Sequence, residues 1–281
     1  MDFTIRPVAT IVAVLAGCTA AWSQEDIRSD VDAGHRQVSI ERILDQTAIP
    51  VYDYKIARTY PHDTGSYTEG LVMQDGKLYE GTGRYGFSEV RLNDIETGKA
   101  IKRYTLGPTY FGEGLTVFGD RIYELTYISN KGFIYDAETF ELEQTFDFLT
   151  QGWGLTHDGT HLLMSDGSSV VRFLDPDTLD TTRAIYVTDD VGPVGFLNEL
   201  EYVDGKLYAN VWQTNFIAII DPKSGKVIGW INLTGLNPDP KTLVYPFVPN
   251  GIAYNTATKR LIVTGKCWPF LWEIDLVERP R

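Results

Sequence analysis

Hydrophobic and polar positions alternate in short runs along most of the chain, from about residue 51 onward. Pairs of apolar runs are separated by tight turns rich in Asp and Gly, which is the pattern of a β-hairpin. Five of these hairpins resemble one another, at residues 70–83, 114–127, 154–167, 199–212 and 251–266. The pattern therefore predicts a series of repeated hairpins rather than helices.

Most of these hairpins are followed by a second one, and an Asp recurs at its turn. The second hairpins lie at residues 88–107, 132–147, 170–187 and 215–232, with turns at Asp94, Asp136, Asp175 and Asp221. Four strands repeated every ~40 to 50 residues are typical of propeller blades. We therefore predict an all-β fold, a five-bladed β-propeller of four-stranded antiparallel blades.

The two ends of the repeat region are complementary. The fifth repeat stops one strand short, after residues 269–276, and an unmatched strand-like segment precedes the first repeat at residues 51–60. Pairing the two segments would complete the last blade and remove two open sheet edges. We predict a propeller domain at residues 49–281, with its last blade closed by the N-terminal strand. An open β-sandwich would not explain the regular repeat.

The N-terminus has the pattern of an export signal at residues 1–23. An apolar run at residues 8–17 follows Arg6 and is too short to span a bilayer as a mature helix. It ends in residues 15–18 (LAGC), which resemble the bacterial lipoprotein box and make Cys18 a lipidation candidate; the alternative is cleavage after Ser23. We expect an exported protein, periplasmic or membrane-anchored by lipid, otherwise secreted.

A charged tether is predicted at residues 24–48, with a short helix around residues 39–46. The whole chain carries 25 basic and 38 acidic residues, a net charge of −13. This balance argues against a nucleic-acid partner and favours cationic ligands such as amines. We expect a monomer that meets a membrane only through a lipid anchor.

Equivalent positions of the repeats locate a candidate site. The hairpins are preceded by Glu69, Glu113, Trp153, Asn198 and Asn250 and closed by Gly83, Tyr127, Gly167, Trp212 and Lys266. If packing alone governed these positions, they would be alike and small. Their variety on a regular scaffold indicates a functional site. For any single acid, hydrogen bonding to backbone amides inside the channel remains an open alternative.

The ring offers acids (including Glu199), one ammonium, two carboxamides and aromatic walls that include Phe111. The sequence has no evident Ser-His-Asp set, Cys–His pair, zinc-type histidine spacing or phosphate loop. These features favour acid–base chemistry on a small polar, cationic ligand.

Motifs in fixed order through the same positions resemble the plant-type glutaminyl cyclases (glutamine cyclotransferases). They include residues 60–64 (YPHDT), 67–70 (YTEG), 110–115 (YFGEGL), 151–156 (QGWGLT), 197–203 (LNELEYV), 208–213 (YANVWQ), 250–255 (NGIAYN) and 264–270 (TGKCWPF). The resemblance covers about residues 60–274 and implies a five-bladed propeller, in agreement with the repeat count.

The resemblance also implies a reaction. The free α-amine of an N-terminal glutamine attacks its own γ-carboxamide, giving pyroglutamate and ammonia. It places the proton shuttle on Glu113, with Lys266 and Asn198 polarising the substrate oxygens. The expected substrate-binding residues are Tyr67, Glu69, Phe111, Tyr127, Trp153 and Trp212.

Two positions depart from the family pattern. Family members usually carry F-T-Q-G where this chain has YTEG, and Trp where it has Tyr127. Glu69 thus adds a second acid near Glu113. Two close carboxylates raise one pKa or recruit a cation. Glu69 is also a candidate for binding the substrate ammonium.

Three functions follow from these observations. The first is a glutaminyl-peptide cyclotransferase (an acyltransferase) that requires no cofactor or catalytic metal and acts on peptides or proteins with N-terminal glutamine. The second is a noncatalytic propeller that binds peptide N-termini or small amines. The third is a calcium-dependent lactone hydrolase, since Glu and Asn in a propeller channel suit a hard cation. A purely structural calcium ion in the channel is a further alternative.

Overall fold

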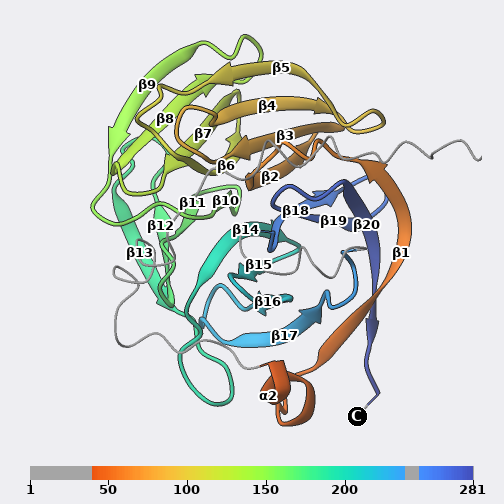
Figure 1. Cartoon of the computed structure of the whole chain (residues 1–281). Helices are drawn as coiled ribbons and strands as arrows, with labels where there is room; N and C mark the ends of the chain where they lie inside the picture. The colour runs from red at the N-terminus through yellow and green to blue at the C-terminus, as the bar shows by residue number, and fades with distance from the viewer. Residues whose placement is uncertain (1–39, 238–246, 281) are drawn as a thin grey trace, which may run out of the picture.

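The computed structural model describes residues 40–237 and 247–280, and these residues are almost entirely β-structure. One short helix, α2 (Ile40–Asp45), precedes the first strand. Figure 1 shows the strands gathered in sheets around a common centre, as in a propeller. The predicted export signal, with Cys18, and residues 24–39 of the predicted tether lie outside the described residues.

Three sheets contain four strands each, hydrogen-bonded in chain order. The first contains β2 (Thr68–Gln74), β3 (Lys77–Thr82), β4 (Glu89–Asp94) and β5 (Lys99–Thr105). The second contains β6 (Gly112–Phe118), β7 (Arg121–Thr126), β8 (Lys131–Asp136) and β9 (Leu142–Asp147). The third contains β10 (Leu155–His157), β11 (Leu162–Ser165), β12 (Val170–Leu174) and β13 (Thr181–Tyr186).

The fourth sheet has eight strands in the order β14-β15-β16-β17-β1-β20-β19-β18. One half contains β14 (Leu197–Val203), β15 (Lys206–Val211), β16 (Phe216–Ile220) and β17 (Val227–Asn232). The other half contains β18 (Pro249–Asn255), β19 (Arg260–Gly265), β20 (Phe270–Glu278) and β1 (Val51–Pro61).

The N-terminal strand β1 joins these two halves unequally. It pairs antiparallel with β20 from Tyr52↔Glu278 to Pro61↔Phe270. Its parallel pairing with β17 is limited to two residue pairs, Val51↔Trp230 and Tyr52↔Ile231. The all-β class and the closure of the last strands by the N-terminal strand are therefore confirmed.

The predicted turns have the backbone that their residues favour. Asp75 and Gly76 both have positive φ, 52° and 75°, as a type I′ hairpin turn requires. At the second turns the recurring Asp accepts hydrogen bonds from backbone N–H groups two or three residues ahead. Asp136 Oδ1, for example, accepts from Glu138 and Thr139. The short-range signals of the sequence were thus sufficient to place the hairpins.

The first strands of the repeats form the inside of the molecule. β2, β6, β10, β14 and β18 contact one another in a closed cycle. Three glycines allow this approach: a Cβ on Gly70 would lie 2.4 Å from Leu115 N, and one on Gly154 would lie 2.0 Å from Asn198 O. A Cβ on Gly114 would lie 2.4 Å from Trp153 O. Each glycine follows one of the ring residues, so the ring is held where neighbouring backbones nearly touch.

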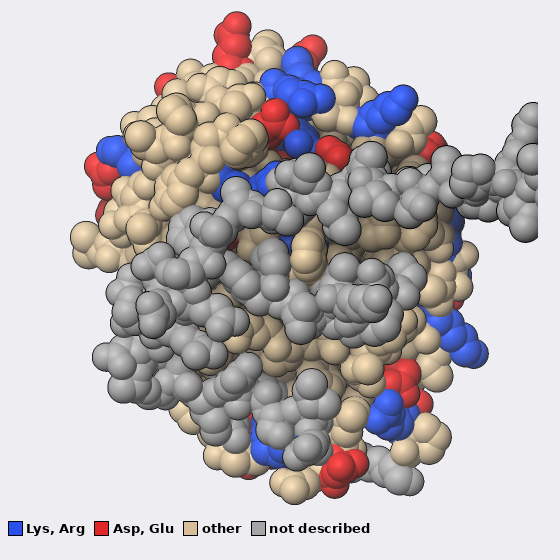
Figure 2. All heavy atoms as spheres, in the orientation of Figure 1, with Lys and Arg blue, Asp and Glu red and all other residues tan. Residues whose placement is uncertain are grey.

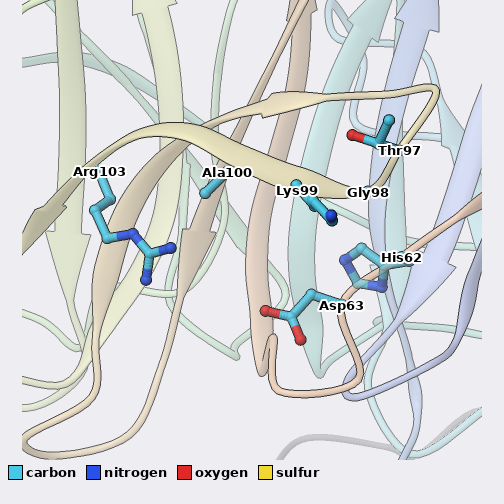
Figure 3. A pocket seen from close by; sticks show the side chains of 7 residues that line it. All are labelled: His62, Asp63, Thr97, Gly98, Lys99, Ala100 and Arg103. Carbon is cyan, nitrogen blue, oxygen red and sulfur yellow. The ribbon is translucent and has the colours of Figure 1, made fainter.

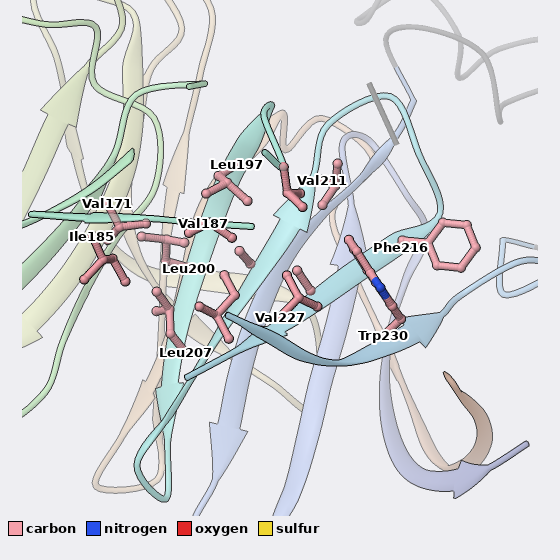
Figure 4. Packing of buried hydrophobic residues seen from close by; sticks show 14 of the residues in the cluster. Val171, Ile185, Val187, Leu197, Leu200, Leu207, Val211, Phe216, Val227 and Trp230 are labelled. Atoms are coloured by element: carbon pink, nitrogen blue, oxygen red, sulfur yellow. The ribbon is translucent and has the colours of Figure 1, made fainter. Parts of the chain in front are cut away.

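Apolar side chains between neighbouring sheets form the core. Figure 4 shows Val171 and Ile185 from one sheet beside Leu200 and Leu207 from the next. The side chain of Ile43, from α2, is fully buried in this same cluster. Burying a residue of this size is worth about 2 kcal/mol.

The short helix predicted in the tether is confirmed, but its setting differs from a solvated tether. Arg42 forms ion pairs with Asp189 and Asp190, and Ala48 N donates to Asp190 Oδ2 at 2.8 Å. Residues 40–48 are therefore packed on the domain. Two acids far ahead in the chain fix the helix, which a local pattern could not reveal. The described residues contain no helix of sufficient length and apolarity to cross a bilayer.

Candidate active site

The ring residues project from irregularities in the inner strands. The register shifts between Thr68 and Gly70, at the position of Glu69, and between Gly112 and Leu115, around Glu113. The same irregularity spans Asn198 in β14 and Asn250 in β18. A bulge takes a residue out of the regular ladder and redirects its side chain. Four equivalent bulges therefore present two acids and two carboxamides at the same end of the sheets.

Glycine closes two hairpins where a neighbouring aromatic ring needs space. A Cβ on Gly83 would lie 2.4 Å from the Phe111 ring and 3.0 Å from Glu69 Cγ. A Cβ on Gly167 would lie 2.6 Å from the Trp153 ring. The small and large residues of the predicted ring are thus complementary.

The five predicted aromatic residues form one buried cluster, together with Val248 and Cys267. Phe111 contacts Tyr67 edge-on and Tyr127 at a tilt, each at 6.1 Å between ring centroids. Trp153 and Trp212 meet edge-to-face at 5.5 Å. The aromatic wall predicted from the sequence is confirmed as a cluster, although its role in binding substrate is untested.

A buried ion pair lies beside this wall. Lys266 Nζ donates to Glu69 Oε1 at 2.5 Å, and Asn250 Nδ2 donates to Glu69 Oε2 at 3.0 Å. The ammonium also lies 4.5 Å from the centre of the Tyr67 ring, a cation–π distance. Glu69 and Lys266 are 1% and 5% exposed, so this pair is desolvated and strongly directional.

Glu113 lies within hydrogen-bonding reach of Glu69. Burial raises the pKa of the Glu113 carboxyl well above its usual range, and the charge of Glu69 raises it further, against the opposing effect of Lys266. Burial also raises the pKa of Glu69, while Lys266 acts to lower it. Lys266 forms its ion pair with Glu69 and not with Glu113. The proton shared by the two carboxyl groups therefore resides on Glu113.

Asn198 is positioned through its backbone. Its carbonyl oxygen accepts from Ser165 Oγ at 2.8 Å, and the same hydroxyl accepts from Gly154 N. Its side-chain Oδ1 is buried and has no hydrogen-bond partner among the described residues. Within that part of the chain no hydrogen bond joins Asn198 to Glu113 or Lys266. An unpartnered buried acceptor is costly, so it fits a group that a ligand would satisfy.

Glu199 differs from the two site acids, although it adjoins Asn198. Its carboxylate accepts from Leu71 N at 3.1 Å and Ile252 N at 2.8 Å, on two other inner strands. Glu201 accepts from Tyr254 N in the same way. Burial raises the pKa of Glu199, and raises that of Glu201 to about 8. Bonding to backbone amides inside the ring therefore accounts for Glu199 but not for Glu69.

Two further aromatic residues adjoin the cluster. Tyr85 packs edge-on against Phe111 at 5.5 Å, and Phe196 packs at a tilt against Trp212 at 6.0 Å. Phe196 stands two residues before Asn198, as Phe111 stands two residues before Glu113. That repeat position could have revealed it. Tyr85 lies in a loop outside the strand pattern, and nothing in the repeat singles it out.

A separate hollow of about 400 Å³ lies between the segment that follows β1 and the β4–β5 hairpin (Figure 3). Its lining contains none of the ring residues and consists of His62, Asp63, Thr97, Gly98, Lys99, Ala100 and Arg103. The hollow is therefore distinct from the candidate active site.

Nowhere in residues 40–237 and 247–280 do three or more His, Cys, Asp or Glu gather as a metal site. On the face seen in Figure 2, acidic and basic side chains are interspersed around the periphery. The expectations that no cofactor and no nucleic acid are needed stay predictions.

Comparisons with known proteins agree on one family. The model of the glutamine cyclotransferase family matches residues 30–276. A glutaminyl-peptide cyclotransferase of Arabidopsis thaliana is 37% identical over 260 residues, which are 91% of this chain and 77% of that relative. The crystal structure of Myxococcus xanthus glutaminyl cyclase matches with a TM-score of 0.77 and 32% identity, covering 83% of this chain and 100% of that one.

Proposed function

The chain belongs to the glutamine cyclotransferase family, and we propose that it is itself a glutaminyl-peptide cyclotransferase. The α-amine nitrogen of an N-terminal glutamine forms a bond to its own γ-carbonyl carbon. The carbon–nitrogen bond of the carboxamide breaks, and the products are pyroglutamate and ammonia. At the level of residues, the proposal depends on one observation. The Glu113 carboxyl is buried, lies within hydrogen-bonding distance of Glu69 and belongs to the same site as the buried aromatic cluster.

Glu113 moves the proton. In its ionised form it accepts a proton from the attacking amine, and it then delivers that proton to the departing nitrogen, since amide ion is a very poor leaving group. A pKa raised by burial suits both halves of this cycle, because a more basic carboxylate accepts the amine proton more readily and, once protonated, can deliver it to the departing nitrogen. The aromatic wall excludes water from the reacting groups.

Lys266 and Asn198 serve the substrate oxygens. The Lys266 ammonium and the Asn198 amide N–H group stabilise the negative charge that develops on the γ-carbonyl oxygen during attack. The unpartnered Asn198 Oδ1 accepts a substrate N–H group. Trp153, Trp212 and Phe111 enclose one side chain and favour the bent conformer from which the ring forms.

The test is ammonia release, with mass detection of the cyclised product, from a peptide that begins with glutamine. We expect turnover by the wild type and a loss of about 10²-fold or more in kcat for Glu113→Gln. Glu201→Gln is the matched control, because Glu201 is also a buried acid of raised pKa but lies outside the site. Failure of the folded wild type to turn over the peptide, with retained binding, would instead support the noncatalytic propeller.

A chelator arm tests the proposal that no metal or other cofactor is required. We expect the same rate before and after exhaustive treatment with chelator. A rate that falls and returns with calcium would contradict it, and lactone hydrolysis that depends on calcium would favour the hydrolase.

We also propose five blades. The closed cycle of five inner strands supports this count, as does the two-pair junction between β1 and β17, which divides the eight-stranded sheet into two groups of four. The export signal predicted from the sequence supports a periplasmic or secreted protein, lipid-anchored if Cys18 is modified. Mass spectrometry of the mature N-terminus separates a lipidated Cys18 from cleavage after Ser23.

A further inference from the structure

We propose that Glu69 is a positioning residue: held ionised by Lys266 and Asn250, it keeps Glu113 protonated in the empty site and so sets the pH at which the shuttle becomes active. This inference rests on the proposed function and deepens it.

The contacts of Glu69 favour its ionised form. Both of its oxygens accept from nitrogen donors, Oε1 from Lys266 Nζ at 2.5 Å and Oε2 from Asn250 Nδ2 at 3.0 Å. Ammonium and amide N–H groups donate hydrogen bonds to a carboxylate, but they cannot accept a hydrogen bond from the O–H group of a protonated carboxyl. When a carboxylate so held also meets a second carboxyl group, the second group must supply the proton between them. That second group is Glu113.

The groups around Glu113 all act on this balance. Glu69 comes from β2, Lys266 from the turn after β19, and Tyr85 from the loop after β3. Glu199, on β14, is close enough to Glu69 for the charge of Glu69 to raise the pKa of Glu199. Only Lys266 is cationic among these groups, and it contacts Glu69. Removing the charge of Glu69 would therefore take a repelling anion from Glu113 and leave Lys266 free to stabilise it.

The consequence for the reaction is a dependence on pH. Glu113 can accept the amine proton only after losing its own, so kcat/KM rises with pH as Glu113 ionises. With glutamine at position 69, Glu113 ionises at lower pH and the acid limb of the profile moves down. Glu69 would thus adjust the enzyme without touching the reacting atoms. Lys266 would be divided between Glu69 and the substrate oxygen.

The deciding experiment is the pH profile of kcat/KM, which reports the free enzyme. We expect the acid limb of Glu69→Gln to lie about one to three pH units below that of the wild type. Glu69→Asp retains the charge and should move the limb much less. Glu201→Gln should leave it in place. The substrate amine titrates identically in all variants, so only differences between variants count.

A second readout does not depend on turnover. Infrared spectra of the substrate-free protein record the carbonyl band of a protonated carboxyl group, and the part lost in Glu113→Gln belongs to Glu113. We expect this part to disappear at lower pH in Glu69→Gln than in the wild type.

An unchanged acid limb in folded Glu69→Gln, or an unchanged Glu113 titration, would overturn the inference while leaving the cyclase assignment intact. If the wild type shows no turnover, the proposed function fails. The infrared titration then still decides whether Glu69 controls Glu113.

Discussion

The β2–β5 and β6–β9 sheets carry glutamates at the same two positions but place them in different electrostatic settings. Glu69 and Glu113 occupy the bulges of the first strands, and Glu80 and Glu124 occupy the fourth position of the second strands. In the first sheet each glutamate forms an ion pair, with Lys266 or with a histidine. In the second sheet neither forms one with any described residue.

Glu80 is fully buried and fully hydrogen-bonded. His62 Nε2 lies 2.9 Å from Glu80 Oε1, and His62 Nδ1 lies 2.8 Å from Trp268 O. Since both ring nitrogens face acceptors, the imidazole is the doubly protonated cation. Three more donors complete the carboxylate, namely the side chains of Ser66, Thr68 and Asn93. Burial alone would raise the pKa of Glu80, but the His62 charge and hydrogen bond lower it to about 2.

Glu124 is equally buried but accepts a hydrogen bond from only one group among the described residues. Tyr135 Oη donates to its Oε2 at 2.8 Å, and its Oε1 has no partner among the described residues. Burial raises the pKa of Glu124 to about 8, so the group is a neutral acid at neutral pH. The contrast shows that a repeat conserves the position of a carboxyl group in the fold, while the neighbours of each sheet decide its charge.

The largest effect should come from replacing Glu80. Glu80→Gln leaves the His62 cation buried without its counter-ion, and we expect a loss of about 3–5 kcal/mol in the free energy of unfolding. Denaturant titration at neutral pH measures it. The same substitution in the other sheet, Glu124→Gln, replaces a neutral group and should cost less than about 1 kcal/mol. Equal losses in the two variants would contradict the comparison.

The two glutamates should also act in opposite pH ranges. The folded pKa of Glu80 is depressed, so its stabilisation is present above pH about 4.5 and is lost as pH falls to about 2. The folded pKa of Glu124 is raised, so its contribution is present below pH about 4.5 and is lost as pH rises to about 8. Each slope is at most about 1.4 kcal/mol per pH unit.

Unfolding measured from pH 2 to 8 tests this expectation. Glu80→Gln should flatten the acid side, and Glu124→Gln should flatten the range between about 4.5 and 8. A wild-type slope that survives unchanged in the matching variant would show that other groups cause it.

A smaller effect than that of Glu80→Gln is expected from removing the hydroxyl that donates to Glu124. Tyr135→Phe leaves the buried carboxyl without its donor, and we expect a loss of about 1–3 kcal/mol in unfolding free energy. Tyr104→Phe is the control, because the Tyr104 ring lies 4.9 Å from that of Tyr135 while its hydroxyl makes no hydrogen bond with any described residue. A control that costs as much would mean that ring packing, not the hydrogen bond, is responsible.

Part of this contrast could be foreseen from the sequence and part could not. The register places Arg91 opposite Glu80 and Phe133 opposite Glu124, and that register follows from the hairpin turns. His62, however, lies outside both repeats, in the segment that connects the closing strand to β2. Its distance from Glu80 depends on how β1 completes the last group of strands.

The candidate site divides in the same way. The repeat positions identified Glu69, Glu113, Asn198 and Lys266 as ring residues, because equivalent residues of equivalent strands must meet around one centre. Glu199 was also counted among the acids of the ring, although it stands one position later in its repeat than Glu69 does. Only the fold shows that one carboxylate meets an ammonium and the other meets backbone amides.

By itself, the sequence determined the hairpins, their turns, the closing strand and the order of the site residues. These features depend on short-range alternation and turn chemistry, which any local segment carries within itself. The tertiary structure alone decided which charges meet: Lys266 reaches Glu69 across 197 positions of the chain, and Arg42 reaches Asp189 across 147. The physical reason is that burial and a neighbour's charge set the state of a carboxyl group, and both exist only once the ring has closed.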